Sequence, residues 1–80
     1  MNYQADHNRM HLNNYLQQRF GRTEDLTWEV GQSGPLHQPQ WVAIAHLRGV
    51  PWGRGQGHNR GSAMEMAAGQ VLQALQTQRF

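Results

Sequence analysis

Arginine and histidine side chains are the groups in this sequence best suited to binding chemistry. All seven basic residues are arginine, and lysine is absent. Arginine presents a planar, permanently charged fork of N–H donors that fits phosphate and stacks on bases or aromatic rings. The net charge is only +2, and the arginines form no run. The sequence alone therefore leaves two interpretations open, a solvated surface or a basic surface assembled by folding.

The stretch GPLHQPQW places His37 just after a Gly34-Pro35 turn, where no turn type requires a histidine. An imidazole carries one donor and one acceptor and so suits a hydroxyl partner. His7 and His11 lie four residues apart, a spacing that can hold a metal, but the sequence offers no third ligand nearby. The five carboxylates are scattered, without the pattern of a nuclease or hydrolase site. We therefore predict no catalytic residue, no metal site and no cofactor.

Hydrophobic periodicity predicts the elements that hold these side chains. Apolar residues three and four apart predict a short amphipathic helix over residues 8–19. Asp6 or Asn8 can cap its start, and Gly21 can end it. This first helix precedes every candidate strand.

Three strands are expected next. Residues 26–30 (LTWEV) and 41–47 (WVAIAHL) are rich in β-branched and aromatic residues. Residues 50–52 predict a short third strand, at an edge because Pro51 cannot donate to a ladder. Short turns between them indicate an antiparallel meander. Residues 53–57, GRGQG, are expected to be a flexible segment.

A second helix carries one apolar stripe, and its small residues, Gly69 among them, would let it approach the sheet closely. The stripe comprises Ala63, Ala67, Ala68, Val71, Leu72 and Leu75. Asn59 can cap the helix, whereas Ser62-x-x-Glu65 spells a capping box three residues later, and we favour Asn59. The expected fold is α+β, in the order α-β-β-β-α, with both helices packed on one face of a three-stranded antiparallel sheet.

The length of 80 residues fits one small domain. We expect residues 1–7 to be a flexible leader, or a cut inside a longer protein, residues 8–76 the folded domain and residues 77–80 a tail. Without cysteine, the chain forms neither disulfides nor a Cys-containing zinc site. The sequence contains no apolar run long enough to span a bilayer and no apolar signal-peptide centre. An intracellular location, cytoplasmic or nuclear, and no membrane partner are expected.

The element order, GPLHQPQW, GRGQG and the Ala67-Ala68 pair together resemble a double-stranded RNA-binding domain. The stretch LNNYLQQR is similar to the first helix of such domains in ribonuclease III and Dicer-like enzymes. The resemblance covers residues 8–75, most of the chain. It implies recognition of A-form RNA by shape, through minor-groove 2′-hydroxyls and phosphates over about 16 base pairs, without sequence specificity.

The resemblance implies three RNA-contacting surfaces. The first is the opening helix, where Asn13 and Asn14 take the positions of a Gln-Glu pair. The second is the loop formed by Gly34, Pro35 and His37, which matches the family without departure. Both amide side chains and the imidazole can donate to and accept from a hydroxyl.

The third implied surface is the start of the last helix, where the family has Lys-Lys-x-Ala-Lys. This chain has RGSAM, so only Arg60 keeps its charge, while Gly61 and Met64 are neutral. Asn59 at the helix start and Arg54 between the glycines complete the expected RNA-binding set. Because each neutralised phosphate adds about 0.9 to the slope of log K against log salt, we expect weaker, less salt-dependent binding than with three lysines.

We expect a non-enzymatic domain that binds double-stranded RNA as a module of, or partner to, an RNA-processing protein. The alternative is a degenerate member of the fold that acts as a protein-interaction or dimerisation module, with a protein partner or a homodimer. Trp52, beside Pro51, is a candidate exposed contact for that role. Neither hypothesis includes a small-molecule substrate.

Overall fold

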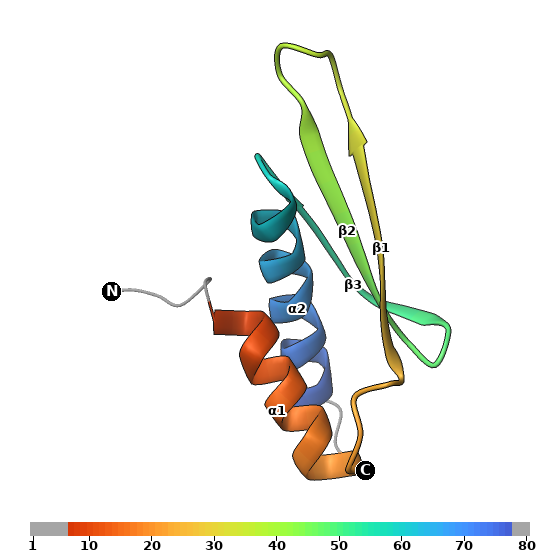
Figure 1. Ribbon diagram of the computed structural model, residues 1–80. Coiled ribbons are helices and arrows are strands. Elements are labelled where there is room, and N and C mark those ends of the chain that lie inside the picture. The colour runs from red at the N-terminus through yellow and green to blue at the C-terminus, as the bar shows by residue number, and fades with distance from the viewer. Residues whose placement is uncertain (1–6, 78–80) are drawn as a thin grey trace.

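A computed structural model describes residues 7–77, and its elements follow the expected order (Figure 1). They are α1 (Asn8–Phe20), β1 (Leu26–Ser33), β2 (Gln40–Leu47), β3 (Val50–Gly57) and α2 (Arg60–Thr77). The strands form one antiparallel sheet in the order β1-β2-β3. α2 lies on β3 and β2, and α1 packs mainly against α2. The predicted α+β fold is confirmed.

The described residues can be compared with the domain limits expected from the sequence. Residues 1–6 and 78–80 lie outside the described residues, and most of the expected leader and tail falls there. α2 continues to Thr77, one residue beyond the expected limit. No helix within residues 7–77 is long and apolar enough to cross a bilayer.

The core is thin because alanine supplies most of it. The buried apolar residues are Leu12, Leu16, Ala43, Ala45, Ala63, Ala67, Ala68 and Val71. Trp28, Trp41 and Trp52 are half-buried and pack around this cluster. Trp28 and Ala45 pair across β1 and β2 on the face that α2 covers. The exposed position proposed for Trp52 was therefore wrong, because its ring packs against the core.

The segment GRGQG is part of a strand, so the prediction of a flexible segment was wrong. β3 extends to Gly57, and Gly53, Gly55 and Gly57 alternate with Arg54 and Gln56. Since successive strand residues point to opposite faces, all three glycines face α2. A Cβ on Gly55 would lie 2.5 Å from the amide nitrogen of Ala67, too close for any side chain. The glycines thus let the backbone of α2 rest directly on β3.

The position of β3 at one edge of the sheet agrees with the prediction from the sequence. β3 is an edge strand, as Pro51 predicts, and its pairing with β2 is irregular between Ala45 and His46. The amide of Arg54 donates to Oε1 of Gln70 in α2 at 2.9 Å. α2 therefore also satisfies part of the exposed edge.

The end of α1 and the start of α2 follow the predicted caps. Gly21 adopts a left-handed φ of 72°, and its amide donates to the carbonyl of Gln17. The side chain of Asn59 accepts the amide of Ser62 at 2.8 Å, so α2 begins at Arg60. The favoured start of α2 is confirmed.

The start of α1 differs from the prediction, because its cap comes from the other helix. Oε1 of Glu65, in α2, accepts the amides of Asn8 at 2.7 Å and Arg9 at 3.3 Å. Asn8 is therefore the first residue of the helix rather than its cap, while Asp6 lies outside the described residues. Gly69 likewise faces Asn8 rather than the sheet, since a Cβ there would lie 2.7 Å from Nδ2 of Asn8.

Candidate functional site

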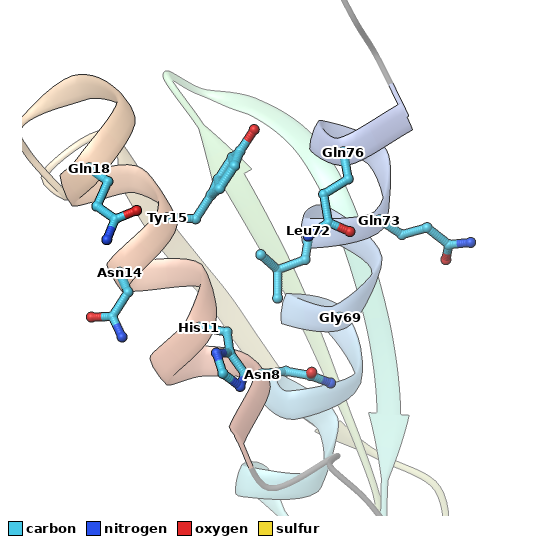
Figure 2. A pocket seen from close by; sticks show the side chains of 9 residues that line it. All are labelled: Asn8, His11, Asn14, Tyr15, Gln18, Gly69, Leu72, Gln73 and Gln76. Carbon is cyan, nitrogen blue, oxygen red and sulfur yellow. The ribbon is translucent and has the colours of Figure 1, made fainter.

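α1 presents both candidate asparagines to solvent. Leu12 and Leu16 are buried, which anchors α1 and leaves Asn13 and Asn14 exposed. Asn14 lies on the rim of a groove between α1 and α2, into which Tyr15 projects (Figure 2). In this view the Asn14 amide points away from α2. The side chain is thus available to a ligand on the outer surface of α1.

The β1–β2 loop holds His37 at the far end of the hairpin, beyond the helices (Figure 1). Gly34 has a φ of 90°, a left-handed conformation that favours glycine. The carbonyl of Pro35 accepts the amide of Gln38 at 3.0 Å, which closes a turn around Leu36 and His37. His37 is exposed, and its ring bonds to none of the residues 7–77. The loop therefore presents the imidazole outward.

The start of α2 and the edge strand β3 together frame two shallow hollows. The first is lined by Asn8, Arg9, Gln56, Asn59, Gly61, Ser62, Glu65 and Met66. The second is lined by Gln40, Arg54, Gly55, Gln56, Gly57, His58, Met66 and Gln70. Since Gln56 and Met66 line both, the hollows adjoin. Arg54 and Asn59 thus line adjoining hollows, and the exposed Arg60 follows Asn59, but the Arg54 side chain points to the sheet face opposite the three glycines.

Ion pairing separates the arginines into two sets. Arg9, Arg22 and Arg48 pair with carboxylates, and Arg19 lies over the ring of Tyr15 at 5.5 Å. Within residues 7–77, no carboxylate lies within ion-pair distance of Arg54 or Arg60. Both are exposed. The two arginines selected from the sequence are thus free to meet an external anion.

The three candidate surfaces lie at different heights along the molecule. The His37 loop and the start of α2 point toward the same end, whereas Asn13 and Asn14 lie in the middle of α1 (Figure 1). They therefore form separate contact points along one elongated body rather than a single pocket. This spacing suits a long ligand with repeated features.

Sequence reasoning missed Arg9 and Glu65. Glu65 is 7% exposed, and Oε2 accepts from Nε of Arg9. The available signal was a second stripe on α2, in which Glu65, Gly69 and Leu72 follow at helical spacing and face α1. The polar first member of that stripe indicates a polar partner on the neighbouring helix.

His7, just before α1, and His11, within it, gain no third candidate ligand among residues 7–77. The rings of His7 and His11 meet edge to face, with centroids 6.3 Å apart. Within residues 7–77, no three His, Asp or Glu side chains gather as metal ligands. His46 instead lies 3.2 Å from Glu29 on the sheet face opposite the helices.

Comparison with known proteins identifies similarity to a ribonuclease. No protein-family model matches the chain. The chain is 38% identical over 65 residues to the ribonuclease 3 of Syntrophotalea carbinolica. The matched region is 81% of this chain and 28% of that enzyme, so the chain spans less than a third of the relative's length. The chain is thus similar to one part of a ribonuclease 3, as its resemblance to ribonuclease III predicts.

Proposed function

We propose that this chain is a double-stranded RNA-binding domain that recognises duplex RNA by shape and catalyses no reaction itself. The observation that carries the proposal is the exposed start of α2, where Arg60 has no carboxylate partner among residues 7–77. The His37 loop points toward the same end of the molecule. The α-β-β-β-α fold and the similarity to ribonuclease 3 support the same conclusion.

Each surface offers the chemistry that A-form RNA requires. His37 and the two asparagines of α1 can exchange hydrogen bonds with 2′-hydroxyls in the shallow minor groove. Asn59 occupies the amides of Ser62 and Ala63, which leaves those of Arg60 and Gly61 to a phosphate oxygen. The positive end of the α2 dipole favours the same anion. Binding would thus depend on backbone geometry rather than on base sequence.

Arg60→Gln and His37→Ala are expected to weaken binding in different ways. Removing a phosphate contact should lower the slope of log K against log salt by about 0.9. Removing a hydrogen bond to a neutral hydroxyl should cost about 2–10-fold in affinity and leave the slope unchanged. Fluorescence anisotropy on a duplex of about 20 base pairs, longer than the ~16 such a domain covers, measures both quantities across salt concentrations.

Arg48→Gln is the matched control for these variants. Arg48 pairs with Asp25 at 3.0 Å beside the β2–β3 turn, at the other end of the molecule from the His37 loop. Its loss should leave affinity and slope unchanged. A slope for Arg60→Gln equal to that of the wild type, or an equal loss in Arg48→Gln, would contradict the assigned surface.

A second candidate function is protein interaction, and one apolar hollow favours it. The hollow holds about 440 Å³ and is lined by Tyr15, Leu16, Arg19, Phe20, Arg22, Asp25, Leu47, Arg48, Val50, Trp52 and Leu75. Phe20 and Val50 are more than half exposed there. Leu47, Arg48 and Val50 place the hollow beside the β2–β3 turn. Figure 1 shows this turn away from the β1–β2 loop, so a protein partner or a second copy in the hollow would leave the proposed RNA surface open. Light scattering over a range of concentrations tests the homodimer, which a monomer throughout would exclude.

A further inference from the structure

Glu65 joins the two helices through a buried carboxylate. Its Oε1 accepts the first two amides of α1, and its Oε2 accepts Nε of Arg9. All three donors come from α1 across 56 or 57 residues of sequence. The contact therefore fixes the guanidinium of Arg9 against α2, although the Arg9 side chain remains 42% exposed.

The far end of Arg9 lies beside the two uncharged positions at the start of α2. Nη1 donates to Sδ of Met64 at 3.8 Å. A Cβ on Gly61 would come within 3.6 Å of Nη2. Gly61 has no side chain to cover Nη2, and Arg9 lines the same hollow as Asn59 and Gly61. The Arg9 guanidinium of α1 thus lies beside Gly61 and Met64, the two positions of α2 that carry no charge.

The guanidinium keeps donors that the protein does not use. Of its five N–H groups, Nε serves Glu65 and one at Nη1 faces Met64, while Nη2 has no hydrogen-bond partner within residues 7–77. The carboxylate of Glu65 lies in the same hollow and offsets part of the charge, but its oxygens already accept three N–H groups. The outward edge of the guanidinium therefore remains available for a charge-assisted hydrogen bond to phosphate.

We propose that Arg9 is a further phosphate-contacting residue, which α1 contributes to the phosphate contact at the start of α2. This inference rests on the proposed function and extends it, because it makes α1 part of two contacts, with 2′-hydroxyls through its asparagines and with a phosphate through Arg9. The Glu65 carboxylate acts as the positioning group that aims the guanidinium.

The salt dependence of duplex RNA binding tests the assignment. Arg9→Gln should lower the slope of log K against log salt by about 0.9, measured on the same duplex of about 20 base pairs as the wild type. Arg22→Gln is the control, because Arg22 pairs with Glu24 beyond the far end of α1 and should leave the slope unchanged. A purely structural role for Arg9 would alter the melting temperature without altering the slope. An unchanged slope in Arg9→Gln therefore overturns the assignment.

A second measurement uses the wild-type protein and so does not depend on the folding of a variant. The nitrogen and proton resonances of the Arg9 guanidinium should shift when duplex RNA is added. Unmoved Arg9 signals alongside shifted Arg60 signals overturn the Arg9 assignment alone. Absence of duplex RNA binding by the wild type at low salt overturns the proposed function instead, so the two failures are distinguishable.

Discussion

Gly55→Ala is expected to destabilise the protein severely, although it adds a single methyl group. The new Cβ would press on the carbonyl oxygen of Ala63 and lie 2.5 Å from the amide nitrogen of Ala67. Both contacts are with backbone, so α2 itself must move away from β3. Overpacking of this kind costs about 3 kcal/mol, which corresponds to a fall in Tm of roughly 12–24 °C for a domain of this size. Thermal unfolding followed by circular dichroism measures it.

Gly31→Ala is the matched control for this substitution. Gly31 lies in β1, and a Cβ there meets no atom within 4 Å. Its replacement should leave Tm at or slightly above that of the wild type, because it only lowers the backbone entropy of the unfolded chain. If the two variants melt together, the close approach of α2 to β3 does not limit stability, and the packing described for the three glycines is wrong.

Glu65→Ala is expected to have the second largest effect. It leaves the amides of Asn8 and Arg9 without their acceptor and the Arg9 guanidinium without its partner. Breaking a fully buried pair costs about 3–5 kcal/mol, but Arg9 is partly exposed and solvent screens part of that loss. We expect a loss of about 2–3 kcal/mol in the free energy of unfolding. Urea titration measures it, and hydrogen exchange should show faster opening of α1.

Two further variants are controls for the stability loss in Glu65→Ala. Glu65→Gln keeps a carbonyl oxygen for the α1 amides and should recover part of the stability. Glu29→Ala removes a carboxylate that is 71% exposed and pairs with His46, so it should cost less than about 1 kcal/mol. Equal losses in Glu65→Ala and Glu29→Ala would show that the junction between the helices contributes no more than an exposed side-chain contact.

The element order and two helix termini could be predicted from the sequence because local chemistry decides them. Gly21 alone accommodates the left-handed end of α1, and Asn59 caps α2 with its own side chain. The length of β3 could not be predicted from the local sequence. Glycines are poor strand formers, and only the approach of α2 explains why Gly53, Gly55 and Gly57 occur at every second position.

The candidate site likewise contains some residues that local sequence predicts and others that it does not. His37 and Arg60 belong to short motifs whose exposure follows from a turn and a helix start, and the structure places both at the surface. The Arg9–Glu65 contact joins residues 56 apart, and the one motif that includes Glu65, the capping box Ser62-x-x-Glu65, predicts a different partner. Its prediction requires the packing of α1 on α2, which depends on the buried Leu12 and Leu16 together with the small residues of α2. The stripe on α2 that begins with Glu65 indicates a polar partner on the neighbouring helix, but only the assembled fold identifies that partner as Arg9.

Recognition of duplex RNA by shape is the central claim, and a comparison of binding to three nucleic acids tests it directly. Wild-type protein is titrated with an RNA duplex of about 20 base pairs, a DNA duplex of the same sequence and single-stranded RNA, all at one low salt concentration. Loss of two 2′-hydroxyl hydrogen bonds, at about 1 kcal/mol each, should weaken binding to DNA by more than about tenfold. Single-stranded RNA, which lacks the groove, should bind more weakly than the RNA duplex. The predicted result is binding of the RNA duplex more than about tenfold tighter than that of the DNA duplex, and tighter than that of single-stranded RNA. Absence of binding to it, or equal affinity for the DNA duplex, would contradict the account.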